Sequence, residues 1–412
     1  MKKIKLGLLP RVIIAIALGI ALGNVLSLPV VRVFVTFNAV FSQFLNFVIP
    51  LIIIGLVTPA IADIGKGAGK LSPKVTDEGA GKLLLATVAI AYADTVLTGV
   101  LSYGVGTSLF PSMISSVSDF SSVVKPEGTA PYFEITIPPM ADVMSALVFS
   151  FLMGLCIAYS NTPTLKNAFM ELKEVITKTI AVAVVPLLPL FIFGIFLDMT
   201  MKGDAMRIMT VFAKIIVVIF ALHIFVLLYQ YVIAGAIVRR NPLRLLINML
   251  PAYFTALGTS SSAATIPVSL RQTLKNGVRN DIASFVVPLC ATIHMSGSTL
   301  KITACALTLC MLEGIPHSLP VFIHFIMMLG IVMVAAPGVP GGSIMAALGP
   351  LASILGFNTE QQALMIALYI AMDSFGTACN VTGDGAIALV IDKMFKPNRK
   401  VAATAADNAP AE

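Results

Sequence analysis

Polar side chains recur at helical spacing near the C-terminal end of the chain. They are Asp373, Thr377, Asn380 and Asp384. Intervals of four, three and four residues place all of them along one face of an α-helix. The surrounding residues are small or apolar, and a carboxylate inside an apolar span marks a functional site unless a salt bridge explains it. This stripe is therefore the first candidate site.

A hydroxyl-rich segment runs from Gly258 to Pro267 and contains three consecutive serines, Ser260, Ser261 and Ser262. Serines flanked by glycine and proline form a poor helix but a good turn with free N–H groups. At a tip between two half-helices, such groups can receive a carboxylate. The alternative is a contact between spans, where small residues often pack.

The third segment runs from Thr292 to Thr299 and is followed by Lys301. A glycine between two serines within an apolar run suggests locally unwound backbone, whose carbonyls can bind a cation. Lys301 places an ammonium deep in the same run, where it needs a partner. Asp94 is one candidate for that partner, and Asp373 and Asp384 are the competitors.

The composition of this 412-residue chain indicates a membrane environment. Hydrophobic residues make up 58% of it and charged residues only 11%, whereas soluble domains carry about a quarter charged residues. Lipid must therefore surround much of the chain, which is long enough for roughly eight to ten spans. The net charge of +7 comes from short basic clusters between apolar runs, the pattern of cytoplasmic loops, so we exclude a nucleic-acid partner.

The basic clusters also predict the topology. With a cytoplasmic N-terminus, Arg244 and Arg271 both fall on the cytoplasmic side, so the segment between them must be a re-entrant hairpin. The segment from Leu319 to Gly356 is broken at 337–342, and both of its ends fall on the outer side of the membrane, so it must also be re-entrant. Two interrupted segments from opposite faces are typical of inverted-repeat transporters with a site at the membrane midplane.

In this order, the motifs resemble those of the dicarboxylate/amino acid:cation symporters, the family of the glutamate transporter homologues. The resemblance covers roughly residues 243–393. Thr259–Pro267 resembles the first hairpin tip, Gly338–Gly341 the second, and Asn380–Asp384 the ion-binding end of the last helix. The first 240 residues agree in span number and loop charge but add no motif.

The resemblance implies an all-α membrane protein with eight transmembrane helices, two re-entrant hairpins and an elevator fold. Residues 1–240 would be mainly scaffold and trimerisation helices (spans 1, 2, 4 and 5), with span 3 (about 80–110) and span 6 (about 206–240) in the transport domain. Residues 241–400 would form the transport core of hairpin 1, span 7, hairpin 2 and span 8, and 401–412 a disordered cytoplasmic tail. We expect a homotrimer in the inner cell membrane with both termini cytoplasmic.

The resemblance also implies the site residues. Substrate would be bound by Ser260, Ser261, Ser262, Val339, Pro340, Gly341, Asp373, Thr377 and Asn380, with Asp373 receiving an ammonium group. Asn380 and Asp384 would bind one sodium ion. Backbone around Thr292 to Met295 and the start of hairpin 2, at about 333–336, would bind another.

The sequence departs from the family pattern in two places. The usual Asn-Met-Asp-Gly-Thr is His294–Ser298 here, and Ser296 replaces the acid of the third cation site. We expect Lys301 to replace that cation and Asp94 to belong to the same region, which leaves one or two sodium ions. Gly376 stands where glutamate carriers have the arginine that pairs with an acidic side chain, so a neutral substrate is favoured.

The predicted function is sodium-coupled symport of a small neutral amino acid such as serine, threonine or alanine, as in the serine/threonine branch. One alternative is a symporter of dicarboxylates or acidic amino acids, proton-coupled through His294 or Lys301. An ion channel or a membrane enzyme is the other. No nucleophile–base arrangement or metal cluster in the sequence supports an enzyme, and paired interrupted hairpins favour alternating access over a channel.

Overall fold

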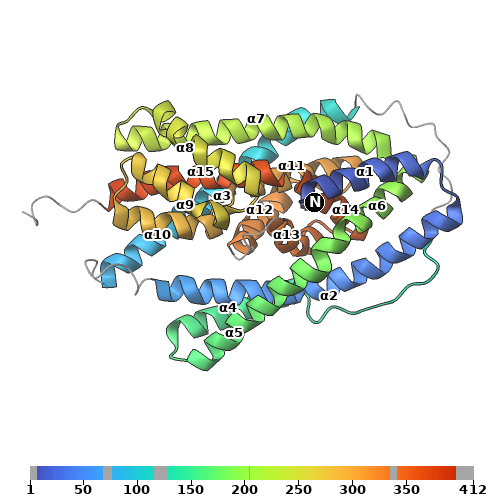
Figure 1. Cartoon of the computed structure of the whole chain (residues 1–412), viewed down its shortest axis with the longest axis horizontal. Coiled ribbons are helices and arrows are strands. Elements are labelled where there is room, and N and C mark those ends of the chain that lie inside the picture. Colours follow the sequence, from blue (N-terminus) through green and yellow to red (C-terminus); the bar gives the residue numbers. More distant parts are fainter. Residues whose placement is uncertain (1–6, 68–76, 116–128, 204, 335–340, 396–412) are drawn as a thin grey trace, which may run out of the picture.

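The structure is a computed structural model that describes residues 7–67, 77–115, 129–203, 205–334 and 341–395. Every regular element in these ranges is helical, and together they form an elongated bundle (Figure 1). The first half contains α1 Leu8–Gly23, α2 Leu28–Gly67, α3 Asp77–Ser115, α4 Val143–Tyr159, α5 Pro163–Thr179, a π-helical turn Ile180–Val184, α6 Val185–Met201 and α7 Ala205–Val238. The second half contains α8 Pro242–Thr259, α9 Ser262–Lys275, α10 Asn280–Ile293, α11 Ser296–Glu313, α12 Leu319–Met333, α13 Gly342–Ser353, α14 Thr359–Ala371 and α15 Asp373–Met394.

Among the described residues, 5 helical segments are long and apolar enough to cross a membrane, or up to 6 with the bent pair α14–α15. They are Leu28–Ala62, Gly81–Ile114, Pro163–Met201, Ala205–Val238 and Asn280–Glu313. The shorter apolar helices α1, α4, α12 and α13 accompany them. The chain is therefore a multi-pass membrane protein.

One apolar run does not form a single helix. Residues 12–31 look continuous in sequence, but α1 ends at Gly23 and α2 begins at Leu28. Pro29 lies in the first turn of α2, where its missing N–H leaves no helical hydrogen bond unmade. Apolar residues on both sides of this turn hide it from a search by hydropathy.

The first group of helices contains α1, α2, α4, α5 and α6, which pack on one another. Two glycines let α1 approach α6 closely, as small residues do between membrane helices. A Cβ on Gly19 would lie 2.8 Å from the Cβ of Phe196, and one on Gly23 would lie 2.4 Å from the Cβ of Thr200. These positions fix the distance between the two helices.

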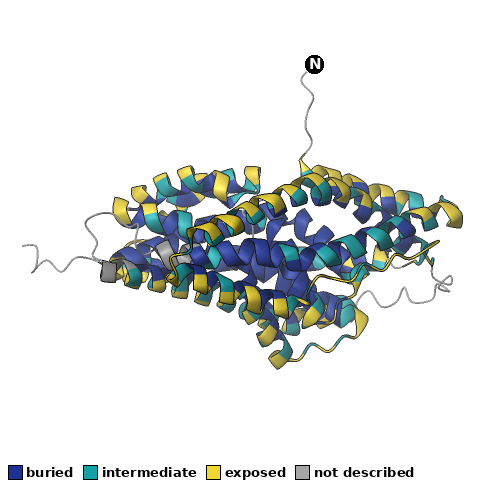
Figure 2. Cartoon of the chain, turned by 90° about the horizontal axis from the view of Figure 1, so that it is seen from below, coloured by how far each residue is buried: buried dark blue, intermediate teal, exposed yellow. Residues whose placement is uncertain are grey.

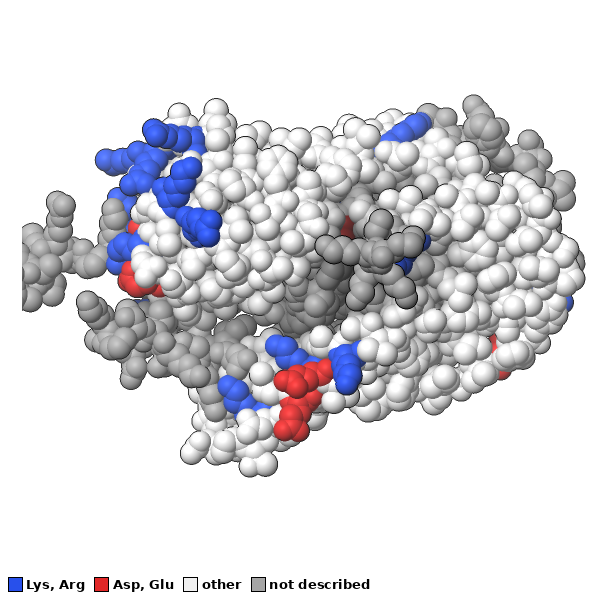
Figure 3. All heavy atoms as spheres, in the orientation of Figure 1, with Lys and Arg blue, Asp and Glu red and all other residues white. Residues whose placement is uncertain are grey.

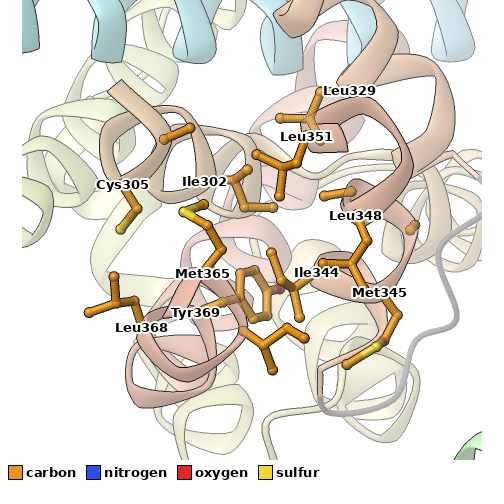
Figure 4. Packing of buried hydrophobic residues seen from close by; sticks show 14 of the residues in the cluster. Ile302, Cys305, Leu329, Ile344, Met345, Leu348, Leu351, Met365, Leu368 and Tyr369 are labelled. Carbon is orange, nitrogen blue, oxygen red and sulfur yellow. The ribbon is translucent and has the colours of Figure 1, made fainter. Parts of the chain in front are cut away.

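The second group surrounds α11 and α15. Helix α15 packs against α7, α8, α9, α10 and α11, while α3 packs against α10, α11 and α12. Figure 2 shows that the centre of the bundle is buried throughout, and α11 is buried from Ser296 to Cys310. In Figure 4, the ring of Tyr369 on α14 lies among apolar side chains that include Ile302 and Ile344.

Exposed basic residues gather at one end of the molecule, near the ends of α7, α8 and α9 (Figure 3). They include Arg239, Arg240, Arg244, Arg271 and Lys275. Helices α8 and α9 pack against each other and are joined only by Ser260 and Ser261. Arg244 and Arg271 therefore lie at the same end, as the charge pattern predicts for a hairpin.

We expect Gly23→Ala to weaken the packing of α1 on α6. The added methyl group cannot fit beside Thr200 without a shift of backbone, and overpacking of this kind costs about 1–3 kcal/mol. The melting temperature of the detergent-solubilised protein should fall. Gly104→Ala is the matched control, because nothing lies within 4 Å of a Cβ at that position in α3. Equal melting temperatures for the two variants would contradict this account of the α1–α6 contact.

Candidate functional site

The candidate site lies where several helices are broken. Helix α10 ends at Ile293 and α11 begins at Ser296, while α14 and α15 meet at Met372 with a bend of 63°. The tip of the first helix pair, α8–α9, reaches this bend, because the hydroxyls of Ser260 and Ser374 are 2.7 Å apart. Helix breaks leave backbone N–H and C=O groups without helical partners, so polar groups are concentrated here.

The tip of the α8–α9 pair has the conformation of a tight turn. Ser260 has φ 50°, in the left-handed region, and ends α8. Ser261 is the N-cap of α9, and its hydroxyl accepts from the N–H of Ala264 at 3.3 Å. Ser262 is buried in the first turn of α9. The serines thus place the N-terminal end of α9 beside the bend between α14 and α15.

Asp373 joins the second helix pair, α12–α13, to the site. Its Oδ2 accepts from the backbone N–H of Gly341 at 2.8 Å. Gly341 has φ 77° and precedes α13, a conformation that favours glycine. Two neighbouring residues of α15 therefore hold both tips, Asp373 at Gly341 and Ser374 at Ser260.

Lys301 approaches the same carboxylate from α11. Its Nζ lies 3.4 Å from Oδ1 of Asp373, 3.3 Å from the carbonyl oxygen of Met372 and 3.5 Å from the ring centroid of Tyr369. The lysine is fully buried. Its ammonium fits because residue 376 is glycine, where a Cβ would lie 2.8 Å from Nζ.

A second charged cluster lies further along α15. His294 is fully buried between two carboxylates, with Nδ1 2.9 Å from Oδ1 of Asp384 and Nε2 2.8 Å from Oδ2 of Asp94. Asp94 also accepts from the hydroxyl of Tyr229 at 2.6 Å and from the amide of Gln230 at 2.7 Å. Ionised carboxylates only accept hydrogen bonds, so both ring nitrogens of His294 act as donors when both acids are ionised.

Asn380 lies between the two charged clusters and caps α11. Its Oδ1 accepts from the N–H groups of Gly297 at 2.8 Å and Ser298 at 3.3 Å. Its Nδ2 donates to the hydroxyl of Ser298 at 3.1 Å and to the sulfur of Met295 at 3.4 Å. The amide thus fixes the break between α10 and α11 against α15.

The structure brings most of the predicted residues together but changes two relationships. Lys301 contacts Asp373, one of the competing acids, and not Asp94. Consequently His294, not Lys301, is the basic side chain beside Asp94, in the region that the resemblance relates to a third cation. Ser296 is buried there, and its hydroxyl lies 3.4 Å from the amide nitrogen of Gln230.

Other predicted residues differ in how they reach the site. The side chain of Thr292 is exposed and donates to the carbonyl of Leu289, so only its backbone faces the break. Thr377 is buried on the same helix as Asp373. Val339, Pro340 and residues 335–336 lie outside the described residues.

Sequence reasoning missed the partners supplied by other helices. They are Tyr229 and Gln230 on α7, Tyr369 on α14 and Ser374 on α15. Gln230 carried a usable signal, since an amide within an apolar span is itself unusual. Ser374 adjoins Asp373 but lies off the stripe, because consecutive residues of a helix point to different sides. Nothing in the spacing indicates Tyr229 or Tyr369.

Comparison with known proteins identifies the family of this chain. The sequence model of the sodium:dicarboxylate symporter family matches residues 8–394. The serine/threonine transporter SstT of Acinetobacter baumannii strain AYE is 27% identical over 427 residues, covering 96% of this chain and 98% of the relative. The serine/threonine transporter SstT of Acinetobacter baylyi is 24% identical over 422 residues, covering 95% and 98%. Because the family match spans nearly the whole chain, the protein belongs to the sodium:dicarboxylate symporter family, as its motifs predict.

Proposed function

We propose that this protein is a secondary active transporter that couples sodium to the transport of a small neutral amino acid such as serine, threonine or alanine. The observation that carries the proposal is the position of Asp373, a buried carboxylate at the meeting point of two helix-pair tips. A carboxylate there can receive the ammonium group of an amino acid. The family is named for sodium symport, and the two relatives are named as serine/threonine transporters.

The first tip supplies the complementary group for the substrate carboxylate. The N-terminal N–H groups of α9, next to Ser261 and Ser262, have no helical partners and carry the positive end of the helix dipole. They can bind an α-carboxylate while Asp373 binds the ammonium. Thr377, one turn along α15 from Asp373, belongs to the same proposed substrate site.

The packing supports a division into two domains. We propose that α1, α2, α4, α5 and α6 form the scaffold and that α3 and α7–α15 form a transport domain that moves past it as an elevator. The α8–α9 and α12–α13 pairs are the two re-entrant hairpins, the remaining helices make eight spans, and the protein is a homotrimer. We also propose that the basic end near α8 and α9 faces the cytoplasm, that both termini are cytoplasmic and that the protein lies in the inner cell membrane.

The second charged cluster fits a transported cation. Oδ2 of Asp384 is buried without a hydrogen-bond partner, and the last carbonyls of α10 lie at the adjoining helix break. In these two clusters, acidic side chains outnumber basic ones by one: Asp94, Asp373 and Asp384 against His294 and Lys301. We propose that one sodium ion balances this charge beside Asp384, while His294 takes the place of a third ion. A second sodium near residues 333–334 remains part of the proposal.

One observation favours a second candidate function. The ammonium of Lys301 lies beside Gly376, the position at which glutamate carriers have an arginine, so a cation reaches the proposed substrate site from another helix. Such a cation could bind the second carboxylate of an acidic amino acid or a dicarboxylate. Uptake into proteoliposomes under a sodium gradient separates the two functions. Competition by aspartate or succinate, and not by serine, threonine or alanine, would select the second.

We expect Asp373→Ala to abolish substrate binding, because no other described carboxylate adjoins both tips. Serine-dependent stabilisation of the purified protein, measured by thermal shift in sodium, should disappear. Asp281→Ala removes an exposed acid at the start of α10 and serves as the control that keeps the stabilisation. An unchanged serine affinity in Asp373→Ala would show that the ammonium binds elsewhere.

We expect Asp384→Asn to weaken sodium binding while preserving the shape of the side chain. Loss of one charged ligand costs about 1.5–3 kcal/mol, so the sodium concentration for half-maximal uptake should rise about tenfold or more. The measurement is initial serine uptake against external sodium, with lithium or choline as replacement. If the sodium dependence of the variant matches that of the wild type, Asp384 does not belong to the ion site.

A further inference from the structure

The ammonium of Lys301 occupies the place that the proposed function gives to the substrate's ammonium. Both oxygens of Asp373 already have donors, Oδ1 from Lys301 at 3.4 Å and Oδ2 from the N–H of Gly341 at 2.8 Å. Only 8% of the Asp373 side chain is exposed. The carboxylate is thus buried and paired with a cation that the protein itself supplies.

This pairing bears on a step that every symporter must complete. After substrate leaves, the empty binding site has to close and return across the membrane. A lone carboxylate closed into an apolar bundle is strongly destabilised, because it loses its hydration without gaining a partner. Asp373 therefore needs a cation in the empty carrier as much as in the loaded one.

The packing of α11 on α15 holds the ammonium of Lys301 beside Asp373. The close approach of α11 to α15 depends on Gly297, where a Cβ would lie 2.7 Å from the carbonyl oxygen of Gly376. Lys301 lies one turn further along α11. Gly376 of α15 has no side chain, which leaves room for the ammonium of Lys301. The carbonyl of Met372 and the ring of Tyr369 also contact the ammonium. These two partners remain when a substrate ammonium takes Oδ1 of Asp373.

We propose that Lys301 is a tethered counter-cation for Asp373, which replaces the substrate's ammonium in the empty carrier and lets it return without any counter-transported cation. Substrate binding displaces the lysine from the carboxylate onto Met372 and Tyr369, and substrate release restores the pair. This inference rests on the proposed binding of an amino acid at Asp373. It assigns Lys301 to the return step and not to substrate recognition.

Lys301→Met tests the proposal, because it keeps an unbranched apolar stem and removes only the charge. Two assays are compared in proteoliposomes: net uptake of labelled serine into serine-free vesicles, and exchange of labelled serine into vesicles preloaded with serine and sodium. Net uptake requires return of the empty carrier, whereas exchange does not. We expect net uptake to fall about tenfold or more and exchange to stay within about threefold of wild type.

Serine affinity provides a second readout. Without a competing ammonium at Asp373, Lys301→Met should bind serine at least as tightly as the wild type does. If Lys301 instead contacts the substrate, both affinity and exchange should fall. Weakened binding with loss of exchange would therefore overturn the proposal, as would normal net uptake in the variant. Lys178→Met, which removes an exposed lysine at the end of α5, is the control and should keep both activities.

The wild-type protein supplies a test that does not depend on any variant folding. Net uptake should proceed at the same rate with potassium, sodium-free choline or Tris inside the vesicles, because the returning site carries its own cation. A requirement for one internal cation would contradict the proposal. Failure of the proposed function has a different signature, since wild-type vesicles would then neither take up nor exchange serine, threonine or alanine.

Discussion

Acidic side chains in an apolar bundle need partners, and this requirement organises the centre of the protein. Asp94, Asp373 and Asp384 are carried by two helices, α3 and α15, and each is paired with a buried basic side chain. His294 contacts two of these acids and Lys301 the third. Because lipid cannot hydrate a charge, each pairing fixes the relative position of helices far apart in sequence.

The helix breaks exist where these charges meet. His294 lies between α10 and α11, Asp373 is the first residue of α15, and Gly341 immediately precedes α13. At each break the backbone exposes N–H or C=O groups that a continuous helix would use internally. These backbone groups support the proposal that the site binds both ends of a zwitterion and a small cation with few charged side chains. The bundle elsewhere is packed with apolar residues, which keeps water away from the paired charges.

The sequence predicted which residues lie at the candidate site better than it predicted which of them contact one another. The period of the Asp373–Asp384 stripe correctly indicated one helix with a polar face. The structure divides that face, since Asp373 meets Lys301, Asn380 caps α11 and Asp384 meets His294. Spacing carries no information on pairs such as Asp94 and His294, which are 200 residues apart. Lys301 could not be assigned among three acids until their helices were placed.

Short sequence patterns predicted those parts of the fold that depend on residues close together in sequence. Alternating basic clusters and the small-residue tip at Ser260–Ser262 predicted the α8–α9 pair, because both depend on neighbouring residues. The boundary at Gly23 was missed, since apolar residues continue on both sides of it. Family membership followed from the order of the motifs, and the match over residues 8–394 confirms it.

We propose that a buried carboxylate at two meeting tips binds an amino acid together with sodium. Calorimetric titration of the purified protein with serine, at zero and at saturating sodium, measures this coupling. Coupled binding is reciprocal, so sodium should raise serine affinity about tenfold or more, and serine should raise sodium affinity equally. Equal serine affinity in sodium and in choline, or no serine binding in either, would contradict the account.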